Sequence, residues 1–142
     1  MALISEDVSG QLKEEFAKLV NPVRLAVFSQ ALADAESEQV RRLVEEIAAL
    51  DPRLSAESYN FVLDTEKVAS FGIQRIPAIA ILGGETDCGI RMYGMPSGYA
   101  FGSLVDGILD VSSGTSGLGE ETANALKALE RPIHVQVFST PT

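Results

Sequence analysis

Residues 72–82 read GIQRIPAIAIL, in which a proline comes directly before a run of small and branched apolar residues. The run predicts a buried strand over residues 76–82. Proline has no N–H to donate to a strand ladder, so within sheets it is confined to edges, bulges and first positions. Pro77 is therefore expected at the mouth of this strand, and the elements on either side of it decide what it faces.

The composition fits one ordinary globular domain. The chain has 142 residues, 46% of them hydrophobic and 22% charged, enough to bury a core. Its net charge of −9 makes nucleic acid a poor partner. The N-terminus does not look like a signal peptide, and no apolar run approaches the roughly 18 residues that a membrane span needs. We therefore expect a cytoplasmic protein with no membrane partner.

Cys88 and His134 are the chain's single cysteine and single histidine. An intramolecular disulfide is thus excluded, and a metal site built from Cys and His is disfavoured. Cys88 lies between Asp87 and Gly89 with no cation beside it to activate the thiol, so a half-buried, inert cysteine is favoured over a redox or peroxidatic one. His134 falls in a predicted strand without a partner motif, which favours a structural role. No cofactor is expected.

Apolar periodicity and the positions of Pro and Gly predict an alternating α/β order. The expected order is a helix over residues 5–20, a strand over 23–28, a helix that ends at 50, a strand over 58–63, a helix over 64–71, strands over 76–82 and 88–93, a helix through 101–109, a helix over 120–129 and a strand over 133–138. With a proline opening the third strand, this is the layout of the thioredoxin fold. The predicted fold is a three-layer α/β/α sandwich with a mixed four-stranded sheet and an extra N-terminal helix.

The domain prediction divides the chain in three. Residues 1–112 form the thioredoxin-like domain, and residues 113–131 form a Gly/Ser-rich linker and a helix. RLAVFS at residues 24–29 is matched by HVQVFS at residues 134–139, each after a helix and a proline. Residues 132–142 are therefore predicted to be the first strand of a second, truncated thioredoxin fold.

In the thioredoxin fold the proline that opens the third strand follows a cis peptide bond and faces the N-terminus of the helix after the first strand. This favours a cis Ile76–Pro77 bond; the alternative is a trans proline that merely starts a strand. The bend exposes the backbone of Ile76, which in this fold pairs with extended peptides by strand addition. Ile76 and Pro77 are the predicted substrate-binding residues.

Redox members of the fold carry C-x-x-C at the facing helix N-terminus, where the helix dipole stabilises a thiolate. Residues 31–38 read ALADAESE and contain no cysteine. A serine hydroxyl stays protonated at neutral pH, and an aspartate there is an N-cap. Dithiol–disulfide exchange at this position is therefore excluded by composition.

Four stretches together resemble the N-terminal half of the glutaredoxin-like protein disulfide oxidoreductases. They are LVNPVRLAVF (19–28), QVRRLVEEIAAL (39–50), FGIQRIPAIAI (71–81) and GIRMYGMPSGYAFGSLVDGILDVS (89–112). The chain is also similar to the N-terminal region of the flavoprotein component of alkyl hydroperoxide reductase. Both families have tandem thioredoxin folds. The resemblance places Asp34 and Ser37 at the C-x-x-C positions, so that site is degenerate, and it places the second C-x-x-C beyond Thr142.

The resulting prediction is a redox-inactive thioredoxin-like domain, the first of a tandem pair, that supports or binds substrate for a unit performing thiol–disulfide exchange. The chain alone is expected to be inactive. Its expected partners are an extended peptide or a second thioredoxin-like domain. The alternatives are a stand-alone interaction domain that dimerises through its unpartnered C-terminal strand, and the N-terminal domain of a peroxide-reductase-type electron-transfer protein.

Overall fold

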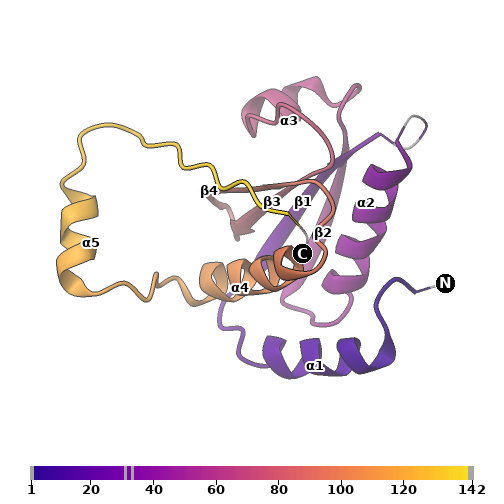
Figure 1. The fold of residues 1–142 in the computed structure, drawn as a ribbon, viewed down its shortest axis with the longest axis horizontal. Helices are drawn as coiled ribbons and strands as arrows, with labels where there is room; N and C mark the ends of the chain where they lie inside the picture. The colour runs from indigo at the N-terminus through magenta and orange to yellow at the C-terminus, as the bar shows by residue number, and fades with distance from the viewer. Residues whose placement is uncertain (1, 31, 33, 141–142) are drawn as a thin grey trace.

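The computed structural model describes residues 2–30, 32 and 34–140 (Figure 1). Its elements in chain order are α1 Glu6–Phe16, β1 Val23–Ser29, α2 Ala35–Ala48, β2 Leu54–Asn60, α3 Thr65–Ser70, β3 Ala78–Gly83, β4 Thr86–Tyr93, α4 Tyr99–Ser113 and α5 Glu120–Lys127. The four strands form one sheet in the order β2-β1-β3-β4, in which β1 and β2 are parallel and the other pairs are antiparallel. The predicted α/β fold with a mixed four-stranded sheet and an N-terminal helix is confirmed.

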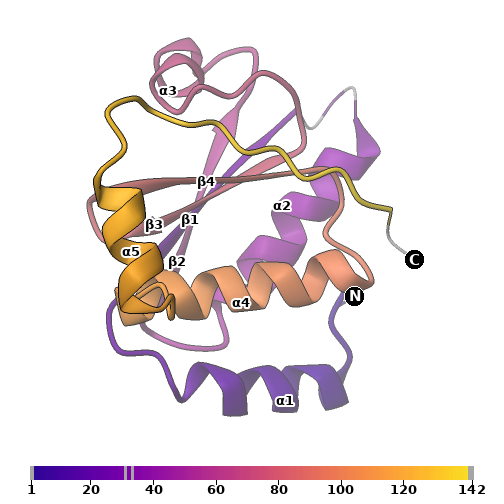
Figure 2. The same cartoon turned by 60° about the vertical axis from the view of Figure 1, so that its left-hand side comes forward.

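The sheet has helices on both faces (Figures 1 and 2). One face packs against α1, α2 and α4 and carries the larger core, which includes Phe16, Leu25 and Ile79. The other face packs against α3 around Phe28. The two central strands are thus buried on both faces, which explains why their sequences read as continuous apolar runs rather than as alternating patterns.

Gly107 brings α4 close to the sheet. A Cβ at this position would lie only 3.0 Å from Cδ1 of Ile81 in β3. The missing side chain therefore permits the close approach of helix and strand that closes this side of the core.

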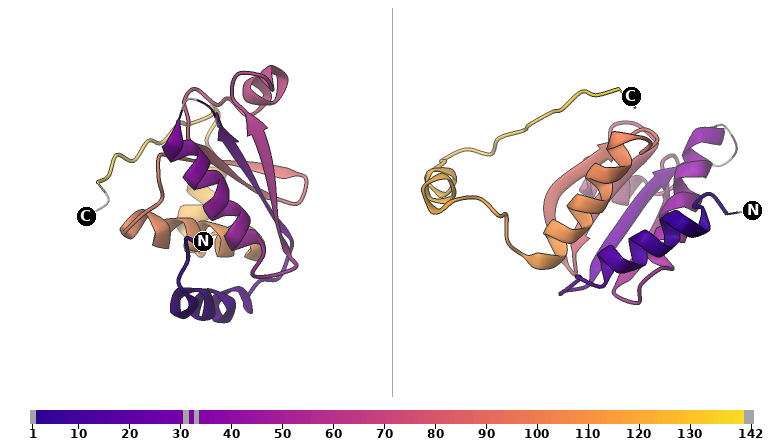
Figure 3. Two further views of the ribbon diagram at one scale, coloured as in Figure 1. Left: turned by 90° about the vertical axis from the view of Figure 1, so that its right-hand side faces the viewer. Right: turned by 60° about the horizontal axis from the view of Figure 1, so that its bottom comes forward.

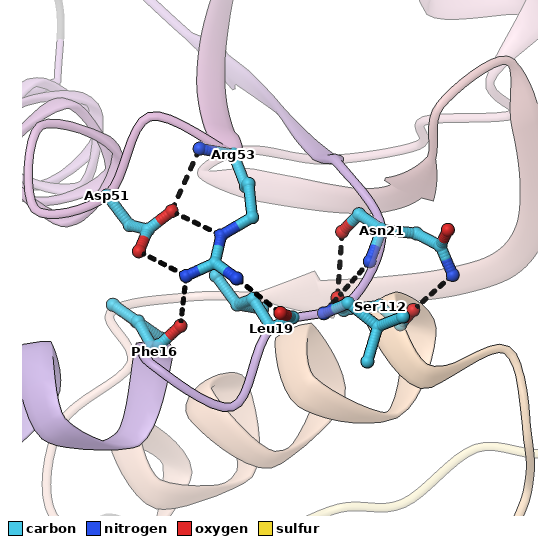
Figure 4. Close-up of polar contacts among 7 residues, drawn as sticks. Phe16, Leu19, Asn21, Asp51, Arg53 and Ser112 are labelled. Atoms are coloured by element: carbon cyan, nitrogen blue, oxygen red, sulfur yellow. Dashed lines mark hydrogen bonds and ion pairs between the residues drawn. The ribbon is translucent and has the colours of Figure 1, made fainter.

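Two polar clusters fix the connection between α1 and β1 (Figure 4). Arg53 is held by Asp51, whose Oδ2 lies 2.7 Å from a guanidinium nitrogen, and it donates to the carbonyls of Phe16, at 2.9 Å, and Leu19. These bonds satisfy carbonyls at and after the end of α1.

Ser112, near the end of α4, forms the second cluster (Figure 4). This residue is 1% exposed, and its hydroxyl accepts from the N–H groups of Val20 (2.9 Å) and Asn21 (3.0 Å) and lies 2.7 Å from the Asn21 carbonyl to which it donates. The helix predicted over residues 5–20 therefore ends at Phe16, because these side chains bind the backbone of the following segment in a non-helical path.

Two other predicted bounds are wrong. The second strand, predicted over residues 58–63, is Leu54–Asn60. Its bounds are set by parallel pairing with β1, from Val23 opposite Leu54 to Ser29 opposite Asn60, and not by its own weak pattern. The strand predicted over residues 133–138 is absent: residues 133–140 have no strand assignment and are exposed. This segment runs separately from the sheet (Figure 3), so a second fold beginning there stays a prediction.

Within the described part of the chain, no helix is both long and apolar enough to cross a membrane.

Candidate functional site

The N-terminus of α2 holds Asp34 and Ser37. Asp34 is the N-cap, and its Oδ1 accepts from the N–H of Glu36 at 3.1 Å. Ser37 is fully buried; its hydroxyl accepts from the N–H of Gln30 at 3.0 Å and lies 3.1 Å from the carbonyl of Asp34. The serine thus ties the end of β1 to the first turn of α2, so its oxygen is a structural link between strand and helix.

The electrostatics of this helix terminus are acidic. Asp34 at the cap is followed by Glu36 and Glu38 in the first turn. Carboxylates there interact favourably with the helix dipole and would oppose a second anion, such as a thiolate, at the same place. The hydrogen bond from Arg41 lowers the pKa of Glu38, which keeps that carboxylate charged. Among the described residues, every buried side-chain nitrogen and oxygen has a partner, so the polar capacity of Ser37 is already used.

The loop before β3 places Ile76 and Pro77 at one end of the sheet. The Ile76–Pro77 peptide bond is cis. Pro77 is buried and its carbonyl accepts from the N–H of Gly94 at 2.9 Å, which continues the β3–β4 pairing by one residue. Within the part of the chain that is described, neither the N–H nor the C=O of Ile76 has a hydrogen-bond partner. Ile76 therefore offers one residue of unpaired strand edge.

Arg91 in β4 holds this loop from the other side. Its Nε donates to the carbonyl of Phe71 at 3.0 Å, and its other nitrogens lie 2.9 and 2.6 Å from the two carboxylate oxygens of Asp87. The same ion pair lowers the pKa of Asp87. Phe71 is the C-cap of α3, so Arg91 fixes the residue from which the loop to Ile76 departs. Arg91 is part of the GIRMYG stretch, but the sequence alone assigned it no role.

An open cavity of about 1120 Å³ lies beside Ile76 and Pro77. Its other walls are the end of β4, one side of α4 and residues 133–139. Arg75 lies at this cavity with its guanidinium carbon 4.9 Å from the centre of the Tyr93 ring. Sequence reasoning missed both residues; the one available signal was a cation directly before Ile76.

Known proteins resemble this chain in both sequence and structure. Over 140 residues, 99% of the chain, it is 26% identical to AhpF of alkyl hydroperoxide reductase in Staphylococcus aureus, and the match covers 25% of that protein. The NTD_N/C domain of AhpF from Enterococcus faecalis superposes with a TM-score of 0.80 at 29% identity, over 90% of this chain and 62% of that one. A protein disulfide oxidoreductase from Aeropyrum pernix gives a TM-score of 0.80 at 32% identity, over 91% of this chain and 56% of that one.

The chain is a thioredoxin-like unit related to the N-terminal region of alkyl hydroperoxide reductase AhpF. The relation to a disulfide oxidoreductase is equally clear in the structures. The unit spans about a quarter of the length of the curated relatives that it matches. No protein-family model matches it.

Cys88 and His134 lie outside the environments expected for them. In this thioredoxin-like unit Cys88 is exposed on β4 rather than half-buried, because β4 is the edge strand of the sheet that the described residues form. His134 lies on the exposed segment after α5 and not in a strand. In the described part of the chain, no three His, Cys, Asp or Glu side chains gather into a set that could hold a metal ion.

Proposed function

We propose that this chain is a redox-inactive thioredoxin-like unit that binds an extended segment along Ile76 and supports a second unit that carries out thiol–disulfide exchange. One observation carries the proposal. At the N-terminus of α2, Asp34 caps the helix and the hydroxyl of buried Ser37 accepts a hydrogen bond from the loop after β1. Both side chains therefore stabilise the fold at this position. A nucleophile for disulfide exchange is missing from the position that the resemblance assigns to C-x-x-C.

The binding role is supported by the Ile76 backbone. An unpaired N–H and C=O at the end of a sheet can hydrogen-bond an extended peptide as an added strand, and the pockets beside the edge then choose the side chains. The cavity beside Ile76 provides the space for such a segment. A second thioredoxin-like domain or an unfolded substrate could present it.

The supporting role rests on the segment after α5. The side chains of Ile133, Val135, Val137 and Phe138 are 64–85% exposed. Four large apolar side chains in one short segment favour a partner surface that covers them. A second fold that begins at this segment would do so; the alternative is a homodimer in which two copies of the segment pair. Sedimentation velocity distinguishes the second-fold model from the homodimer model, because the homodimer model predicts a dimer of the 142-residue chain.

A cytoplasmic setting belongs to the same proposal. The only thiol, Cys88, has no intramolecular partner, so nothing in the chain needs an oxidising compartment to form a disulfide.

Insulin-disulfide reduction in the presence of dithiothreitol tests the redox part. The chain is expected to add nothing to the rate of dithiothreitol alone. The double variant Asp34→Cys/Ser37→Cys should form an internal disulfide, detected by mass spectrometry as a loss of two hydrogens, and should raise the rate. Ser37→Cys alone is the matched control. Turnover by the unmodified chain that disappears in Cys88→Ser would contradict the proposal.

Nuclear magnetic resonance tests the binding part. A peptide of Thr-Gln repeats, which is uncharged and extended, is expected to shift the amide resonances of residues 74–76 and of Gly94. Saturating peptide that leaves this loop unchanged would remove the support for a docking edge at Ile76.

A further inference from the structure

Arg75 is a cation whose hydrogen-bonding edge is unused. Its guanidinium lies over the ring of Tyr93, at 4.9 Å from the ring centre. A guanidinium over an aromatic ring is attracted by the ring's electrons, and this contact uses no hydrogen-bond acceptor. Among residues 2–30, 32 and 34–140, no carboxylate forms an ion pair with Arg75, and no hydrogen bond from its side chain is formed. The N–H donors of Arg75 are therefore available to a ligand.

The nearby arginine is different. Arg91 lines the same cavity, but both oxygens of Asp87 and the carbonyl of Phe71 already occupy its donors. Arg75 is thus the cation of this cavity with donors to offer a ligand.

The charge of the cavity also departs from that of the chain. The chain carries a net charge of −9. The charged residues that line the cavity are Arg75, Arg91 and Glu36. Asp87 neutralises Arg91, so Arg75 is the cation of this cavity that no carboxylate among the described residues pairs. An unpaired arginine on an acidic molecule attracts a carboxylate at close range, although the molecule as a whole repels an acidic ligand.

We propose that Arg75, held by Tyr93, selects an acidic side chain in the extended peptide that docks along Ile76. This rests on the proposed docking edge and adds the chemistry of the ligand. Side chains directly opposite each other on paired strands point to the same face and lie close enough to interact. Arg75 directly precedes Ile76 in a bend before β3, so if one peptide residue pairs with Ile76, a neighbouring residue of the peptide comes close to Arg75. An Asp or Glu at that neighbouring position can accept two parallel hydrogen bonds from the guanidinium.

Binding of three repeat peptides to the 142-residue chain tests this proposal by fluorescence anisotropy. The peptides alternate Thr with Glu, Gln or Lys, so that a register shift of two residues presents the same face. At about 0.15 M salt, exposed charges farther apart than about 8 Å are largely screened. The Thr-Glu peptide is expected to bind roughly three- to fivefold more tightly than the Thr-Gln peptide, which is the upper part of the range for a single exposed ion pair and suits two parallel hydrogen bonds. The net charge alone predicts the opposite order, with Thr-Lys the tightest.

Two variants with the same change in net charge separate the local effect from the global one. Arg75→Gln should bring the Thr-Glu and Thr-Gln affinities together. Lys13→Gln, in α1 and away from the cavity, should preserve their difference. Circular dichroism checks that both variants are folded; Arg75 is exposed, so its replacement should leave the fold intact.

The outcomes also distinguish the failure of this proposal from the failure of the proposed docking edge at Ile76. Equal binding of Thr-Glu and Thr-Gln peptides, with shifts centred on residues 74–76, would overturn the role of Arg75 and leave the docking edge standing. Absence of binding by all three peptides would overturn both. A preference for Thr-Glu that survives Arg75→Gln would place the selective cation elsewhere and would also overturn the proposal.

Discussion

Replacing Ser37 by alanine removes the hydroxyl that joins the end of β1 to the first turn of α2. The side chain is fully buried, accepts from the N–H of Gln30 at 3.0 Å and lies 3.1 Å from the carbonyl of Asp34. Losing the partner of a buried polar group costs about 1–3 kcal/mol. Gln30 itself is half-buried, so water can reach part of the vacated site and the expected loss is about 1–2 kcal/mol.

The same loss can be expressed as a melting temperature. Unfolding entropies of about 2.1 cal/mol/K per residue give roughly 0.3 kcal/mol/K for a chain of this length, so the midpoint should fall by about 3–7 °C. Urea unfolding followed by circular dichroism measures the free energy directly. Ser103→Ala is the matched control, because it makes the same chemical change on an exposed turn of α4. If Ser37→Ala is as stable as Ser103→Ala, the hydroxyl does not hold the loop and the structural interpretation of Ser37 is wrong.

Three further perturbations test the links around the site and the core. Ser112→Ala leaves two backbone N–H groups without their acceptor; Val20 and Asn21 are exposed, so water can replace part of the loss, and the expected cost is about 1–3 kcal/mol by urea unfolding. Hydrogen bonds from Arg53 lower the pKa of Asp51 to about 2. The stability from this pair is therefore present above about pH 4 and lost as the pH falls through about 2. Asp51→Asn should be less stable than the parent at pH 5, with the difference shrinking by pH 2; a constant difference would contradict this. Arg91→Lys keeps the charge but cannot bond Phe71 and Asp87 together, so it should shift the amide resonances of residues 72–76 while Lys13→Gln does not.

The central strands were predictable because burial shapes their composition. Both faces of β1 and β3 are covered, so each strand is a continuous apolar run, and the predicted ranges differ from the observed ones by two residues or fewer. β2 was misplaced because LSAESYN at the sheet edge has neither a run nor an alternation. Its bounds come from pairing with β1, a long-range interaction that a local pattern does not contain.

The candidate site also contains residues that the sequence could indicate and contacts that it could not. Asp34 and Ser37 were identifiable because a strand–helix junction has a fixed place in the predicted order. The two carbonyls that Arg53 binds lie 34 and 37 residues away in sequence, and the contact of Arg75 with Tyr93 depends on where β4 ends relative to the loop. These contacts exist only once the sheet has formed, so no spacing in the linear sequence indicates them.

The hydrogen bonds around the Ile76–Pro77 loop distinguish groups that stabilise the fold from groups that remain available to a ligand. The Pro77 carbonyl bonds to Gly94, Arg91 fixes the end of α3, and Ser37 closes the loop before α2. Each of these groups has a partner within the chain, so the fold alone accounts for it. The backbone of Ile76 and the guanidinium edge of Arg75 lie side by side in the chain, and no hydrogen bond within the described residues uses either of them. A ligand contributes most where the fold has left donors and acceptors unpaired, so these two neighbouring residues are where binding should be measured first.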